Sequence, residues 1–90
     1  MGTLDKFEQA IALAEKMGYK IRYEALAGSS SGGVCEFGGS RWIFIDLGLS
    51  VDERLDLISE ALLADPSLPV SELSAGLKSH FGFPARKVAA

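Results

Sequence analysis

Acidic side chains on one predicted helix are the first residues that could do chemistry. Residues 46–65 contain six acidic residues and one basic residue. On a helical projection, the acids pointing away from the apolar positions are Asp52, Glu53, Asp56 and Glu60. With Asp52 beside them, Glu53, Asp56 and Glu60 could attract a divalent cation or a basic partner, and Asp56 or Asp46 could hold a cation together with Glu60. The alternative is a solvated helix surface, which is favoured because hard cations usually take several oxygens from loops.

A glycine- and serine-rich segment is the second candidate site. It consists of Gly28, Ser29, Ser30, Ser31, Gly32 and Gly33. Its backbone N–H groups could bind an anion, as glycine-rich loops do. The segment lacks the lysine and Ser/Thr of a P-loop and the spacing of a dinucleotide-binding loop, so a plain connecting loop is the alternative.

Cys35 and His80 are the chain's single cysteine and single histidine. They could form a nucleophile and its base, but Glu36 beside Cys35 disfavours a thiolate. We therefore expect a buried structural cysteine and a surface histidine. One cysteine excludes a disulfide within the chain, and one of each residue cannot build a four-ligand Cys/His zinc site. The sequence predicts no catalytic residue, no metal site and no cofactor.

Aromatic and leucine side chains are the candidates for binding. Phe37, Trp42 and Phe44 could stack on a base or a small ligand, although a core also needs aromatic residues. Leu57 and Leu63 lie off the apolar stripe of their predicted helix. Covering both leucines would contribute roughly 2–4 kcal/mol, at about 25 cal/mol per Å². We expect an interface with a second copy or another protein around Trp42 and Phe44, with Leu57 or Leu63 alongside.

Apolar spacing and turn residues place these candidates on secondary structure. The prediction comprises a helix over 3–17 capped by Thr3 and ended by Gly18, strands over 19–25, 34–37 and 41–47, a helix from Ser50 to about Asp65, and a third helix from Pro69 or Ser71 to His80. Gly38 and Gly39 predict a tight hairpin. Ser50 and Glu53 form a capping-box pattern. The near-continuous apolar run at 42–45 indicates a central strand.

This order predicts an α+β fold, with a three-stranded antiparallel sheet packed on one face by two or three helices in the order α-β-β-β-α-α. Residues 1–82 form the single expected domain, since the chain has 90 residues. Residues 83–90 are expected to be a loosely held tail.

The run from Trp42 to Leu63 resembles the edge strand and active-site helix of compact zinc metallopeptidases, the zincins. Ser59-Glu60-Ala61-Leu62-Leu63 falls where His-Glu-x-x-His would stand. Glu60 matches the general base, but Ser59 and Leu63 replace both zinc-binding histidines. The resemblance therefore implies a catalytically degenerate domain.

The chain is also similar to small uncharacterised bacterial proteins with a Gly-x-Cys, Trp-x-Phe-Ile-Asp-Leu and Ser-x-x-Glu-Arg-Leu pattern. Gly33, Cys35, Trp42 and the residues that follow carry this similarity. This resemblance implies no activity.

Composition narrows the class of partner. Nine basic against 12 acidic residues give a net charge of −3, which argues against a nucleic-acid or anionic membrane surface. The chain lacks an apolar run long enough to span a membrane, and its single cysteine suits the cytoplasm. The sequence thus predicts a cytoplasmic, non-enzymatic interaction module that associates with itself through its sheet. The alternatives are a degenerate zincin-like domain using Glu60 and an anion- or small-ligand-binding domain.

Overall fold

The computed structural model describes residues 2–25 and 32–83. Its elements are α1 (Thr3–Lys16), β1 (Tyr19–Glu24), β2 (Gly32–Phe37), β3 (Ser40–Asp46), α2 (Val51–Leu63), a short 3₁₀ helix η1 (Val70–Glu72) and α3 (Ala75–Phe81). The α+β class and the order of elements are as predicted.

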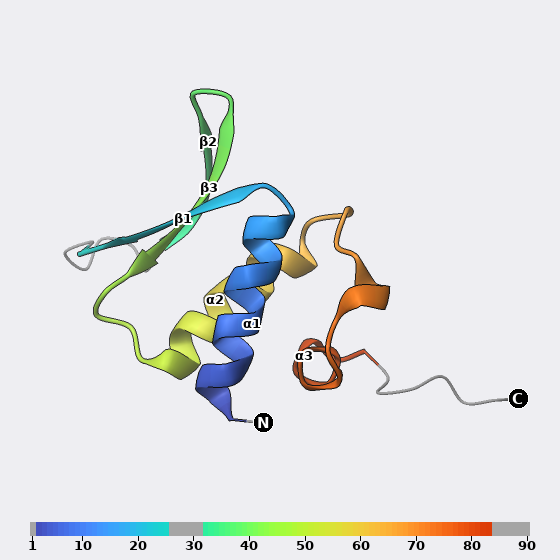
Figure 1. The fold of residues 1–90 in the computed structure, drawn as a ribbon. Helices are drawn as coiled ribbons and strands as arrows, with labels where there is room; N and C mark the ends of the chain where they lie inside the picture. The colour runs from blue at the N-terminus through green and yellow to red at the C-terminus, as the bar shows by residue number, and fades with distance from the viewer. Residues whose placement is uncertain (1, 26–31, 84–90) are drawn as a thin grey trace, which may run out of the picture.

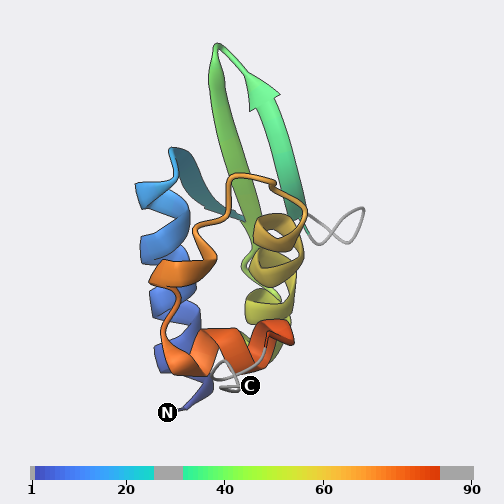
Figure 2. The same cartoon turned by 90° about the vertical axis from the view of Figure 1, so that its right-hand side faces the viewer.

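The elements form three layers (Figure 1). The sheet packs against α1 and α2, which lie side by side, and α3 lies on the far side of this helix pair from the sheet (Figures 1 and 2). The β2–β3 hairpin extends well beyond the helices, so its tip is not covered by the helix layer (Figure 2). The helices thus cover one face of the sheet, as the sequence predicted.

The sheet has the strand order β1-β3-β2, which makes β3 the central strand. β2 pairs with β3 antiparallel, but β1 pairs with β3 in parallel, with Tyr19 opposite Arg41 and Glu24 opposite Asp46. The prediction of a wholly antiparallel sheet is therefore wrong. Since β1 and β2 lie on opposite sides of β3, they are two strand spacings apart, about 10 Å.

Local signals fix most of the element ends. Ser50 and Glu53 form the predicted capping box, in which each side chain bonds the other residue's backbone N–H. Gly38 and Gly39 both have positive φ, 62° and 78°, as a tight hairpin turn requires. Gly18 follows α1 with φ 103°, but Gly2 rather than Thr3 is the N-cap of that helix.

The predicted third helix is two shorter pieces. η1 ends at Glu72, and Ser74 begins α3 by accepting a hydrogen bond from the Leu77 backbone N–H at 3.2 Å. The Ser74 hydroxyl also donates to Gln9 Oε1 on α1 at 2.5 Å. Leu73 is extended and Ser74 caps a new helix, so the helical spacing of Leu73, Leu77 and Phe81 does not come from one continuous helix, although all three are buried.

The core lies between the sheet and the helices. Its most deeply buried large side chains are Ile43, Ile45, Ile58 and Leu62. Leu77 and Phe81 of α3 belong to the same cluster, and Phe83 packs partly against it. The packed part of the chain thus reaches one residue beyond the predicted boundary at 82, and residues 84–90 of the predicted tail lie outside the described residues.

Candidate functional site

The sheet face opposite the helices carries the candidate binding surface. Ile43 and Ile45 on β3 are fully buried in the core. Because side chains alternate along a strand, Trp42 and Phe44 point to the other face. Among the residues that the structure describes, no helix packs on that face (Figure 1). The structure thus brings together two of the four residues predicted for an interface.

Phe37 joins these two side chains in an aromatic cluster. Its ring stacks on Trp42, with the ring centroids 5.4 Å apart and the planes 3° from parallel. Phe44 lies 6.1 Å from Trp42 and 6.5 Å from Phe37. The Lys20 ammonium lies 5.3 Å from the centre of the Trp42 ring, which is a cation–π contact. We call Phe37, Trp42 and Phe44 the aromatic cluster.

The cluster holds an unsatisfied polar group. Trp42 Nε1 is buried and has no hydrogen-bond partner within the described ranges 2–25 and 32–83. Leaving a buried donor unpaired costs about 1–3 kcal/mol, so such atoms are uncommon in folded proteins. Phe37 itself is 53% exposed, although aromatic side chains usually bury most of their area. The aromatic cluster is therefore partly exposed to water, and its buried Trp42 N–H donor lacks a partner among the described residues.

β2 forms one edge of the sheet and is exposed from Val34 to Phe37. Val34, Cys35, Glu36 and Phe37 are all exposed, with Val34 48% exposed. The expected burial of Cys35 is therefore wrong. The prediction failed because the residue pattern of β2 does not distinguish an edge strand from a central strand. Only the order of the strands in the sheet shows that β2 is an edge.

Leu57 and Leu63 do not extend the aromatic cluster. Both lie on α2, in the layer on the opposite face of the sheet (Figure 1). Leu57 packs partly against the core, whereas Leu63 is 45% exposed. The structure therefore separates the predicted interface into an aromatic pair on the sheet and two leucines on the helix layer.

The predicted carboxylate site is a shallow surface feature of α2. Asp56 and Glu60 are both exposed and line a depression with Leu49, Glu53 and Leu57. Within 2–25 and 32–83, no three His, Cys, Asp or Glu side chains are placed to hold a metal ion. Asp56 Oδ1 instead lies 3.6 Å from His80 Nε2 on α3. This arrangement matches a solvated helix surface.

The predicted anion-binding segment is divided by the start of β2. Gly28, Ser29, Ser30 and Ser31 lie outside the described residues, whereas Gly32 and Gly33 are the first residues of the strand. Gly32 has φ 120°, and a Cβ there would overlap the backbone carbonyl of Phe44. Strand packing therefore accounts for this glycine without a ligand.

Cys35 and His80 do not form a catalytic pair. Cys35 lies on the sheet edge, while His80 lies on α3, beyond the helix pair (Figure 1). His80 is half-buried beside Asp56 and Phe81, rather than fully on the surface as predicted. The structure thus supports no nucleophile and base from these residues.

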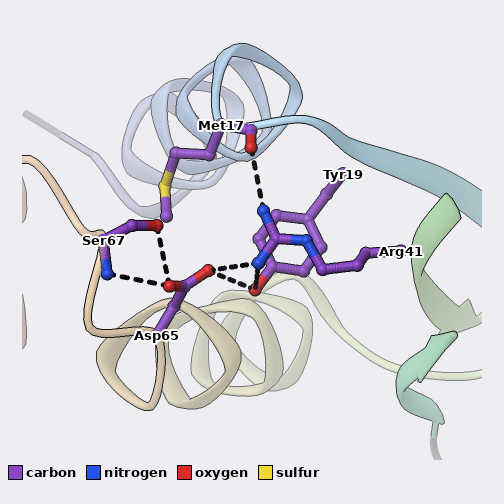
Figure 3. Close-up of polar contacts among 5 residues, drawn as sticks. All are labelled: Met17, Tyr19, Arg41, Asp65 and Ser67. Carbon is purple, nitrogen blue, oxygen red and sulfur yellow. Dashed lines mark hydrogen bonds and ion pairs between the residues drawn. The ribbon is translucent and has the colours of Figure 1, made fainter.

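A second polar cluster, which sequence reasoning missed, centres on Asp65 (Figure 3). Asp65 Oδ2 accepts hydrogen bonds from Tyr19 Oη at 2.6 Å and from Arg41 Nη1 at 2.7 Å. Asp65 Oδ1 accepts from the Ser67 backbone N–H at 2.9 Å and the Ser67 hydroxyl at 2.8 Å. Arg41 Nη2 donates to the Met17 carbonyl at 3.0 Å, and the guanidinium lies 4.2 Å from the Tyr19 ring centre.

These contacts give the Asp65 cluster a structural role, because one carboxylate holds Tyr19, Arg41 and Ser67 together. Hydrogen bonds from Tyr19 and Ser67, with the Arg41 ion pair, hold the pKa of the Asp65 carboxyl well below its usual range. Burial and the bond to Asp65 raise the pKa of Tyr19, and the bond to Asp65 raises that of Arg41. Both carboxylate oxygens already accept two bonds each, so Asp65 has no free lone pair for a ligand.

Comparison of the chain with protein-family models, curated proteins and solved structures found no match in any of the three. At the two positions that the sequence resemblance aligns with zinc ligands of zincins, neither side chain is a usual metal ligand. Ser59 is buried and donates its hydroxyl to the Leu55 carbonyl at 2.6 Å, and Leu63 is apolar. In the described part of the chain, no helix is both long and apolar enough to cross a membrane.

Proposed function

We propose that the protein is a non-enzymatic interaction module that binds a second copy of itself through the exposed surface of its sheet. The observation that carries this proposal is the aromatic cluster on the face opposite the helices. Phe37 leaves half of its side chain in water although it stacks on Trp42. Burying such a ring against a partner is favourable by about 25 cal/mol per Å² of apolar area.

Two further features support an interaction rather than catalysis. The carboxylate at the centre of the Asp65 cluster already accepts two hydrogen bonds at each oxygen from Tyr19, Arg41 and Ser67. A small domain also gains proportionally more from a partner, since a chain of this size buries only a modest share of its surface alone.

Phe37→Ser tests the proposal, with Leu4→Ser on α1 as the matched control. Leu4 is 55% exposed and Phe37 53%, so the two substitutions remove similarly exposed apolar side chains. We expect sedimentation equilibrium to show self-association of the wild type and Leu4→Ser, and weakening of about tenfold or more for Phe37→Ser. Far-UV circular dichroism checks that both variants fold. A wild type that stays monomeric, or a Phe37→Ser variant that associates like the wild type, would contradict the proposal.

A further inference from the structure

We infer that two copies pair through the outer edges of their β2 strands, running antiparallel, with Cys35 of one copy opposite Cys35 of the other. This inference rests on the proposed self-association and specifies its geometry. The pairing joins the two sheets into one six-stranded sheet with both aromatic clusters on the same face.

The two edges of the sheet differ in their protection against pairing. β1 carries Lys20, Arg22 and Glu24 among its six residues, and Arg22 and Glu24 form an ion pair. Charged side chains, lysine above all, discourage an edge strand from pairing with another chain. β2 has only one charged residue, Glu36, and no proline. Among the described residues, β2 is therefore the edge strand that is less protected against pairing with another strand.

The hairpin determines which backbone groups of β2 point outward. Phe37 and Ser40 flank the two-residue turn, and such a flanking pair exchanges hydrogen bonds between the strands. Bonded and non-bonded pairs alternate along an antiparallel ladder, so the backbone groups of Val34 and Glu36 point away from β3. These residues can bond a second β2 strand without disturbing the existing ladder.

In a twofold antiparallel pair, residues whose backbone groups point away from β3 must lie opposite one another. With Val34 and Glu36 as these residues, the three possible registers are Val34 opposite Val34, Val34 opposite Glu36, and Glu36 opposite Glu36. Glu36 opposite Glu36 is unfavourable because two carboxylates would face each other directly. Of the other two, Val34 opposite Glu36 places Phe37 opposite Gly33 of the second copy. A Cβ on Gly33 would meet nothing within 4 Å, so this position has room for the aromatic ring. This register also covers one side of the exposed Phe37 ring.

The shape of the molecule permits this pairing. Each hairpin tip extends beyond its own helix layer, while the start of β2 lies beside α2 (Figure 2). In an antiparallel pair, the free tip of one copy lies beside the helix-covered half of the other, and the helix layers lie at opposite ends. Two hydrogen-bonded pairs supply about four main-chain bonds. The Cys35 Cα atoms would be about 4.5 Å apart, within the range for a disulfide.

Cys35→Lys and Cys35→Ala test the edge by sedimentation equilibrium. Cys35 is exposed, so neither side chain has to enter the core. Lysine at the twofold axis places two like charges directly opposite each other, and we expect a dissociation constant raised about tenfold or more over that of Cys35→Ala. If Cys35→Lys associates as tightly as Cys35→Ala while Phe37→Ser is monomeric, edge pairing is wrong and the proposed function stands. If wild type and Cys35→Ala are both monomeric, both proposals fail.

Disulfide trapping tests the register. Oxidised glutathione takes the two electrons from two Cys35 thiols, forming one disulfide between copies and releasing two glutathione thiols. The comparison is Val34→Cys in the Cys35→Ala background, whose new cysteines would be diagonal neighbours about 7 Å or more apart. We expect the wild type to form the covalent dimer faster on a non-reducing gel. Faster trapping at position 34 would overturn the register.

Discussion

At the residue scale, Asp65 ties together parts of the chain that are distant in sequence. Its carboxylate contacts Tyr19 at the start of β1, Arg41 on β3 and Ser67 in the segment after α2. Only 7% of the Asp65 side chain is exposed, so water contributes little to balancing its charge. One buried carboxylate therefore connects the sheet to the segment between α2 and η1.

Asp65→Asn should lower the free energy of unfolding at neutral pH, with an effect that depends on pH. Because the folded-state pKa of Asp65 is lowered, the stability it contributes is complete above the unfolded pKa of about 3.9 and is lost as pH falls. Urea unfolding should therefore show a difference from wild type at about pH 7 that shrinks by about pH 3. Glu8→Gln, which removes an exposed carboxylate on α1, is the control. A difference that stays constant with pH would contradict this account of Asp65.

The residues of the Asp65 cluster show why sequence reasoning missed it. Asp65 stands before Pro66 and is explained locally as the end of a helix. Tyr19 fits the alternation of a half-buried strand, and Arg41 looks like an ordinary first strand residue. The contact between Tyr19 and Asp65 spans 46 residues of chain, and no local pattern indicates it.

At the element scale, the parts that could be predicted are those with local causes. The capping box at Ser50 and the hairpin glycines act within a few residues, so their spacing is visible in the sequence. The parallel pairing of β1 with β3 depends instead on how the chain crosses from β1 to β2. The aromatic cluster was predicted in part, since Trp42 and Phe44 were identified, but the edge position that exposes Cys35 depends on the same crossing.

Ser50→Ala tests the contribution of the capping box to α2. Ser50 Oγ accepts from the Glu53 backbone N–H at 3.2 Å, and losing this bond leaves a donor at the helix start unpaired. We expect a loss of about 1 kcal/mol in the free energy of unfolding. Ser79→Ala, at an exposed position within α3, should change stability by less than about 0.5 kcal/mol. Equal effects of the two substitutions in urea unfolding would remove the special role assigned to Ser50.

At the scale of the whole molecule, the helices cover one face of the sheet and leave the other open. Ile43 and Ile45 are buried on the side of the sheet where α1 and α2 pack, while Trp42 and Phe44 of the same strand face away from these helices (Figure 1). The projecting hairpin adds an edge strand, β2, that carries a single charged residue, Glu36 (Figure 2). A second copy paired along β2 would lie beside the exposed Phe37 ring and reduce its contact with water.

The central claim is that a second copy binds the sheet surface around the aromatic cluster, and Trp42 fluorescence tests it most directly. Trp42 is the single tryptophan of the chain, so its emission reports on this surface alone. As protein concentration rises, we predict a shift of the emission to shorter wavelength, because association removes water from the stacked Phe37–Trp42 pair. The shift should share its midpoint with the increase in mass measured by sedimentation. An increase in mass with unchanged Trp42 emission, or no association at any concentration, would contradict the claim.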